Sequence, residues 1–296
     1  MTISGFSYVR NGIEIGYPFL EAVQSILPVC DEFIIAVGDS TDGTREAVEQ
    51  LNASKIKIVD TTWDMNLREG GKIFAQQANI ALDHTIGDWA FHIQADEVIH
   101  ERDLPKITDA IHRYNKDERV EGFILPFYHF WGDYTHIRTA RSVHLHEIRI
   151  FRNNKVVRSY KDSQGFRKYS GKQAYEEGTE KGEKLSVKKI DAPIYHYNGV
   201  RPKEVMKKKL YTFSSYYDKD IEADTFNQFN FQQVDRVAKF KGTHPKVMEQ
   251  KVNAQDWEFE FDPTKSAWRT KDKLIQPLED LIGFKIGEYK NYKLLR

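Results

Sequence analysis

Short apolar runs alternate with amphipathic segments through the first hundred residues. The apolar runs predict strands at residues 3–9, 33–37, 56–59 and 89–93, and the amphipathic segments predict helices at 15–27, 44–51 and 73–82. Strands that alternate with helices form a mostly parallel sheet with right-handed crossovers. Ligands bind such sheets beyond the carboxyl ends of the strands, so we expect functional residues in the loops that follow them.

The pattern changes after residue 100. Asp103-Leu104-Pro105 predicts the start of a helix that runs to about residue 114, because Asp suits the cap and proline is tolerated in the first turn. Extended strands are predicted at 122–131, 143–151 and 190–197. Residues 161–184 are charged and contain glycine with little periodicity, which is equally typical of a mobile loop and of an ordinary surface excursion.

These elements predict an α/β fold with two regions. Residues 1–200 would form the sheet domain, with a ligand-binding half at about 1–100 and a second half at about 101–200. The chain is mainly helical in pattern from Lys203 onward, so residues 201–296 are expected to pack on the sheet domain as a mainly helical region.

Composition narrows the function classes. Lys and Arg together number 44, as do Asp and Glu, so the chain has no general attraction for nucleic acid or an anionic membrane. Cys30 is the only cysteine and follows an apolar run, which excludes an internal disulfide and favours a buried, inert thiol. The sequence contains no signal-peptide pattern and no apolar stretch long enough to span a membrane, so we expect a cytoplasmic protein.

Two strand-end segments carry candidate chemistry. The loop 38–44 joins a strand to a helix with small residues, and Asp39 at the strand end can accept hydrogen bonds from a base or ribose, whereas Thr41 or Asp42 suits the helix cap. The strand at 89–93 is followed by Gln94-Ala95-Asp96-Glu97, which places acids at the carboxyl edge of the sheet. A carboxylate there can hold a divalent cation that bridges two phosphates, or it can be a plain surface acid.

Together, the segments 30–44 and 87–97 resemble family 2 glycosyltransferases of the GT-A fold. The resemblance covers roughly the first 150 residues. The family's first motif usually reads Asp-Asp-Gly-Ser-Thr-Asp-Gly-Thr, and here it is one residue shorter, with Gly38-Asp39 in place of its leading part. The second motif is usually Asp-Ala-Asp, and here Gln94 replaces the first acid.

The resemblance implies a GT-A-type fold, a UDP- or GDP-linked sugar donor, a divalent metal (Mn²⁺ or Mg²⁺) on the diphosphate, and transfer with inversion at the anomeric carbon. A glycan or glycolipid acceptor and a role in polysaccharide biosynthesis follow by analogy, and peripheral contact with a membrane stays open. The positions that match the family's nucleotide-binding residues are Val9, Arg10, Asn11, Asp39, Ser40, Arg68, Lys72, Gln94 and Asp96.

The resemblance also implies metal ligands and a catalytic base. Asp96 matches the metal-binding acid, and His196 lies at the end of a predicted strand, where it is either a second metal ligand or a buried structural histidine. Inverting transfer needs a general base, for which Asp162 is our first candidate and Glu147 and Asp133 are rivals.

Other patterns favour plain structural roles. The basic run of Lys203, Lys207, Lys208 and Lys209 on a predicted helix is typical of a solvated face, with a diphosphate or lipid-linked anchor as the alternative. The aromatic side chains of Tyr128, Phe130 and Trp131 are assigned to the core rather than to stacking on a sugar.

The leading hypothesis is therefore a metal-assisted, inverting glycosyltransferase. A sugar nucleotidyltransferase is the first alternative, but its usual glycine-rich, basic first loop is absent from Tyr8-Val9-Arg10-Asn11-Gly12. The second alternative is a non-catalytic nucleotide- or glycan-binding protein on the same fold, which the substitution at Gln94 keeps open.

Overall fold

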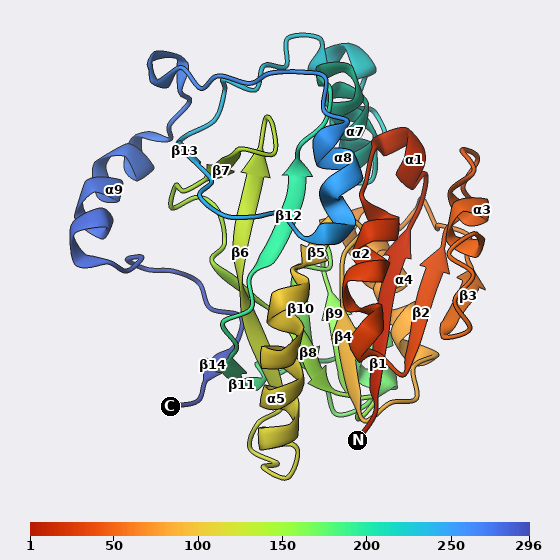
Figure 1. The fold of residues 1–296 in the computed structure, drawn as a ribbon. Coiled ribbons are helices and arrows are strands. Elements are labelled where there is room, and N and C mark those ends of the chain that lie inside the picture. Colours follow the sequence, from red (N-terminus) through yellow and green to blue (C-terminus); the bar gives the residue numbers. More distant parts are fainter.

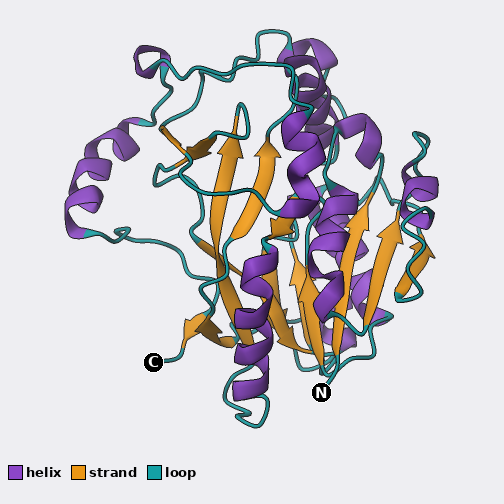
Figure 2. Ribbon diagram, in the orientation of Figure 1, coloured by secondary structure: helices purple, strands orange, loops and turns teal.

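The computed structural model describes residues 1–296 as one central sheet with helices on both faces (Figures 1 and 2). The main path of the sheet has the order β13-β7-β6-β8-β4-β1-β2-β3. The strands are β1 Ile3–Val9, β2 Glu32–Val37, β3 Ile56–Asp60, β4 Trp89–His92, β5 Glu97–Ile99, β6 Gly122–Trp131, β7 His136–Arg138, β8 His146–Arg152, β9 Val157–Tyr160, β10 Gly165–Lys168, β11 Ser186–Lys189, β12 Ile194–Gly199, β13 Val237–Lys239 and β14 Lys293–Leu294.

The helices connect these strands and cover the sheet. They are α1 Gly12–Ile15, α2 Phe19–Ile26, α3 Thr44–Glu49, α4 Lys72–Asp83, α5 Leu104–Tyr114, α6 Lys172–Glu176, α7 Lys203–Ser215, α8 Glu249–Asn253 and α9 Thr270–Ile282. β1 pairs in parallel with both β2 and β4, and β2 pairs in parallel with β3. β8 then runs antiparallel between β4 and β6. The predicted α/β class is confirmed, with the parallel part of the sheet where the strand–helix alternation placed it.

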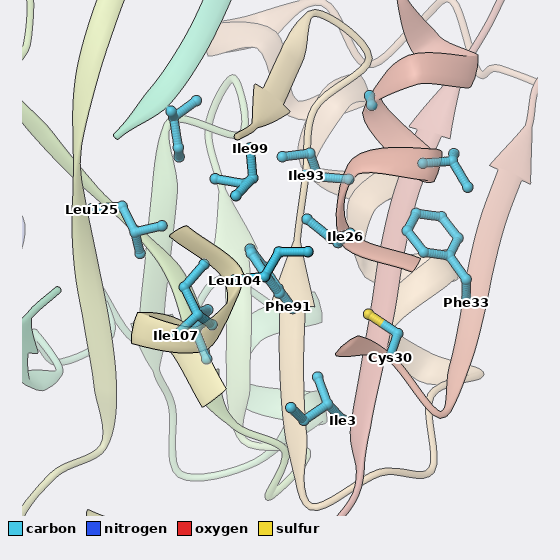
Figure 3. Close-up of a cluster of buried hydrophobic side chains, with 14 of the residues drawn as sticks. Ile3, Ile26, Cys30, Phe33, Phe91, Ile93, Ile99, Leu104, Ile107 and Leu125 are labelled. Carbon is cyan, nitrogen blue, oxygen red and sulfur yellow. The ribbon is translucent and has the colours of Figure 1, made fainter. Parts of the chain in front are cut away.

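The core lies on both faces of the sheet because the parallel strands are apolar on both sides. One cluster packs α2 and α5 against the sheet, with Ile26 from α2, Ile107 from α5 and Phe91 from β4 among its buried side chains (Figure 3). Cys30 is part of this cluster and is buried, as expected. On the opposite face, Leu82 of α4 belongs to a second cluster.

Two expectations from the sequence were wrong in detail. The helix expected at 15–27 is split into α1 and α2, because Gly16 adopts a left-handed conformation (φ 72°) and Pro18 disfavours helical backbone before it. The irregular loop expected at 161–184 contains β10, which pairs with β9, and the short helix α6. This hairpin is held on α4, where the side-chain amide of Asn79 bonds both the N–H and the C=O of Ser159.

The C-terminal region is more than a helical cap. Its helices are α7, α8 and α9, but β13 and β14 also join the sheet through β7 and β11, and long stretches between these elements are irregular. Figure 1 shows α9 lying apart from the sheet. None of the helices combines the length and the apolar composition that a membrane crossing requires.

Candidate functional site

A cavity of about 400 Å³ opens at the carboxyl ends of β1 and β4, where the parallel sheet places its ligand-binding edge. Val9 and Arg10 line it after β1, and Gln94, Ala95 and Asp96 line it after β4. The start of β8, the end of β12 and one side of α7 form further parts of its wall. Residues from distant parts of the chain therefore meet around Asp96.

A buried ion pair holds the segment that carries Asp96. The next residue, Glu97, accepts two hydrogen bonds from the Arg149 guanidinium, at 2.8 Å and 2.7 Å, and both side chains are almost fully buried. Glu97 also accepts from the backbone N–H of Gln94, whose side-chain amide donates to the Ser163 carbonyl. Glu97 thus has a structural role, and the turn it stabilises presents Asp96 to the cavity.

Asp96 is buried among cationic groups. His196 Nε2 lies 3.6 Å and Lys209 Nζ lies 3.8 Å from the same carboxylate oxygen, Oδ2. Burial alone would raise the pKa of Asp96, but His196, Lys209 and Arg201 outweigh it and hold the pKa of this carboxyl below its usual range. Asp96 is therefore an anionic acceptor inside the cavity.

A second histidine orients His196. His129 Nε2 lies 2.8 Å from the His144 carbonyl, which can only accept, so this nitrogen carries a proton. Burial lowers the pKa of His129 to about 3, so His129 is neutral and its Nδ1 accepts from His196 Nδ1 at 2.9 Å. His196 therefore carries a proton on Nδ1, and its Nε2 faces Asp96 Oδ2 at 3.6 Å, where it helps to hold the pKa of Asp96 low.

Lys209 and Arg201 add buried positive charge beside this pair. The sequence analysis assigned Lys209 to a solvated face, which was wrong: its side chain is 7% exposed, whereas that of Lys208 is 50% exposed. Lys209 Nζ and Arg201 Nη1 both donate to the Asn198 carbonyl, and Arg201 Nε and Nη2 have no partner. Burial lowers the pKa of both groups, so an anion beside them would stabilise their charged forms.

Both leading candidates for the catalytic base line the cavity. Glu147 Oε2 and Asp162 Oδ1 are buried atoms without hydrogen-bond partners. Burial raises the pKa of Glu147 to about 7 and also raises the pKa of Asp162. The third candidate, Asp133, does not line the cavity: its carboxylate lies 2.7 Å from His136 Nδ1 and caps the N–H of Thr135.

The end of the cavity near β1 is aromatic. Trp63, Phe74 and Tyr216 pack together in a small cluster and line the wall. Arg10 lies over the Trp63 ring and forms an ion pair with Asp39 at 3.0 Å. Trp63 Nε1 is buried without a partner and lies beside Gly38, where a Cβ would come within 2.5 Å of it.

The other predicted nucleotide-binding residues lie outside the cavity wall. Asn11 and Ser40 join the loop after β1 to the loop after β2. The Asn11 N–H donates to Ser40 Oγ, and Asn11 Oδ1 accepts from the backbone N–H of Thr41. Arg68 donates to the Ser215 carbonyl, and Lys72 forms an exposed pair with Glu69. Direct contact of these residues with a donor stays a prediction.

Several cavity residues were not predicted as functional. Trp131, assigned to the core, lines the cavity, as do Trp63 and Arg149. One signal was available for Lys209: Met206, Lys209 and Phe213 are spaced as one side of a helix, and all three face the cavity. The partnership of His129 with His196 had no such signal, because the two lie 67 residues apart.

Comparisons with known proteins add little to this picture. No protein-family model matches the sequence, and no curated protein matches it. Among solved structures, the chain is similar to residues 1–349 of S. aureus TarS, with a TM-score of 0.40 and 13% identity over 76% of this chain and 68% of that one. The same fragment is also described in complex with UDP-GlcNAc, at a TM-score of 0.40 and 14% identity over 76% of this chain and 69% of that one. A likeness this weak assigns neither a family nor a function.

The raised pKa of Glu147 predicts a pH-dependent cost to stability. The folded state holds the proton of the Glu147 carboxyl more tightly than the unfolded state, with a pKa of about 7 against 4.5. The stabilisation that the bound proton gives to the folded state is therefore complete below pH 4.5 and is lost as the pH rises through 7. As the pH rises from 4.5 to 8, we expect the free energy of unfolding of Glu147→Gln to increase by about 1–3 kcal/mol relative to that of the native protein, measured by urea unfolding. The exposed Glu118→Gln should show no such trend, and an equal trend in both variants would contradict the assignment.

Proposed function

We propose that this chain is an inverting glycosyltransferase of the family 2 type, which moves a sugar from a nucleoside-diphosphate donor to a hydroxyl group of a glycan or glycolipid acceptor. One observation carries the proposal. A single cavity at the carboxyl edge of the parallel strands combines an aromatic wall, a buried Asp96–His196 pair beside two buried cations, and two acids with raised pKa. The aromatic wall would contact the nucleoside, the Asp96–His196 pair and the cations would serve the diphosphate, and one of the acids would take the proton of the reacting hydroxyl.

The Asp96–His196 pair fits a divalent cation. His196 Nε2 faces a carboxylate oxygen of Asp96 in the cavity, and a cation that replaced the proton of Nε2 would be held by both. His129 fixes the orientation of the His196 ring, as outer partners of metal-bound histidines do. No group of three or more His, Cys, Asp or Glu side chains in the chain could hold a metal, so this site would offer two protein ligands. Asp96 and His196 would therefore hold Mn²⁺ or Mg²⁺ with the donor's phosphates as further ligands, and the ion would neutralise charge on the departing diphosphate.

The chain's own cations serve the same diphosphate. Lys209 lines the cavity and has ammonium hydrogens that the protein leaves without an acceptor, whereas Arg201 does not line it and adds positive charge behind Lys209. Donation to phosphate oxygens would restore the charge that burial disfavours. The nucleoside would then extend toward the aromatic end of the cavity, which Arg10, Trp63 and Tyr216 line.

Glu147 and Asp162 provide the base on the other side of the cavity. A carboxylate whose pKa is near 7 is deprotonated enough to act at neutral pH and basic enough to take a proton from a hydroxyl group. The negative charge of Asp162 adds to burial in raising the pKa of Glu147. We assign Glu147 as the base and Asp162 as the neighbouring acid that tunes it.

The first test uses neighbouring lysines as a matched pair. Thermal melting of the full chain is measured with UDP, GDP, CMP and TDP, each with and without Mn²⁺. We expect one nucleoside diphosphate to stabilise the protein, more strongly with Mn²⁺, by about 2.7 kcal/mol at a hundredfold excess over its Kd. Lys209→Met should weaken this binding about tenfold to a hundredfold, because it removes a charged hydrogen-bond donor.

Lys208→Met is the control, because Lys208 lies on the exposed side of α7 and pairs with Glu14. Its nucleotide binding should match that of the native chain. Absence of stabilisation by every nucleotide would refute the donor site, and equal losses in the two lysine variants would refute the role of Lys209.

The second test concerns the base. The substrate is the sugar nucleotide that carries the nucleobase found to bind in the first test. In its hydrolysis water is the acceptor, so the rate reports on proton removal although the natural acceptor is not known. We expect the rate to rise with pH as Glu147 loses its proton near pH 7, and Glu147→Gln to lower it about 10²- to 10⁴-fold with nucleotide binding retained. Asp162→Asn should keep most of the rate but shift the pH profile. The reverse pattern would make Asp162 the base.

A further inference from the structure

A second cavity of about 320 Å³ adjoins the first and shares two of its residues, His144 and Glu147. Its walls come from the strand β8 and the loop before it, the start of α9, and the segment that follows α9. Glu147, the proposed base, therefore stands where the two cavities meet. The first cavity approaches it from the side of Asp96, and the second approaches it from the C-terminal region.

Three polar atoms on residues of this second cavity are buried without a partner: His146 Nε2, Glu147 Oε2 and Asn291 Nδ2. The Asn291 amide is already oriented, because its Oδ1 accepts from the Tyr160 hydroxyl at 2.7 Å and from Arg167 Nε at 3.1 Å. Its Nδ2–H groups are left to donate. Buried polar atoms are rarely left unsatisfied, so three on one cavity indicate a polar ligand.

Gly165 leaves room for two of these buried atoms. A Cβ at this position would lie 2.5 Å from Asn291 Nδ2 and 3.2 Å from Glu147 Oε2. The first distance is shorter than any ordinary contact, so a side chain would displace the amide. The hairpin of β9 and β10 therefore closes over Asn291 and Glu147 without filling the space beside them.

The cavity is polar but balanced in charge. Its basic side chains are Arg141, Arg269 and Lys285, and its acidic ones are Glu147, Asp272 and Glu288. Arg141 is already neutralised, because it bonds Asp272 at 2.7 Å. The Lys285 ammonium donates to backbone carbonyls of Arg141 and Val143. Because its basic and acidic side chains are equal in number, such a lining does not attract a polyanion, and it offers hydrogen-bond donors and acceptors close together.

We propose that this second cavity binds the acceptor, and that the acceptor is a neutral, hydroxyl-rich saccharide. This inference depends on the proposed glycosyltransferase function. The Glu147 carboxylate takes the proton of an acceptor hydroxyl as the hydroxyl oxygen bonds to the anomeric carbon of the donor sugar. The bond from the anomeric carbon to the diphosphate breaks in the same step, and its electron pair leaves with the diphosphate.

The test is binding of simple sugars to the full chain, measured by saturation-transfer NMR. The probes are the methyl glycosides of glucose, galactose and N-acetylglucosamine, with methyl glucuronide as the charged comparison. We expect at least one neutral glycoside to bind and the glucuronide to bind more weakly. His146→Phe and Arg269→Ala should each weaken binding of the neutral glycoside about fivefold to tenfold, because each removes a polar partner.

Nucleotide binding separates the two proposals. Both variants should keep the nucleotide-induced rise in melting temperature. Asp39 pairs with Arg10 and lines neither cavity, so Asp39→Asn should keep glycoside binding. Native chain that binds a nucleotide but no glycoside, or that prefers the glucuronide, would overturn the acceptor site while the transferase proposal stands. Unchanged glycoside binding in both second-cavity variants would overturn it as well. Glycoside binding without any nucleotide binding would instead refute the transferase and with it the acceptor role.

Discussion

The buried ion pair between Glu97 and Arg149 is the interaction on which the site depends. It joins the turn after β4 to the strand β8 through two short hydrogen bonds. Asp96 precedes Glu97, and Glu147 lies two residues before Arg149 on the same side of β8. One pair of side chains thus sets where both functional acids stand. Removing either partner would leave a buried charge, at a cost of about 3–5 kcal/mol.

The two acids experience opposite environments within one cavity. Asp96 is surrounded by His196, Lys209 and Arg201, which keep it ionised despite its burial. Glu147 has Glu97 and Asp162 nearby, and burial raises its pKa to about 7. Two carboxyl groups whose environments push their pKa values apart suit different roles. In the proposed reaction, the first faces the departing diphosphate and the second faces the hydroxyl that attacks.

The sequence predicted what depends on local pattern. The alternation of strands and helices placed Asp96 at the carboxyl edge of a parallel sheet, and the structure confirms that position. It could not predict partners that only the tertiary fold brings together, such as Arg149 for Glu97, 52 residues away, or His129 for His196. The segment 283–292 falls in the region expected to be mainly helical, yet it lies outside α9 and supplies Asn291 to the second cavity. Lys209 lies between these cases, because its burial follows from helical spacing once the neighbours on α7 are considered.

The central claim is that Asp96 and His196 hold a divalent cation on the donor diphosphate. Pulsed electron paramagnetic resonance of Mn²⁺, bound to the full chain with the nucleoside diphosphate that stabilises it most, tests this directly. The account predicts coupling of the ion to ³¹P and to one imidazole ¹⁴N, with the nitrogen coupling lost in His196→Gln. Coupling to ³¹P with no nitrogen coupling in the native chain would contradict it, because the ion would then be held without His196.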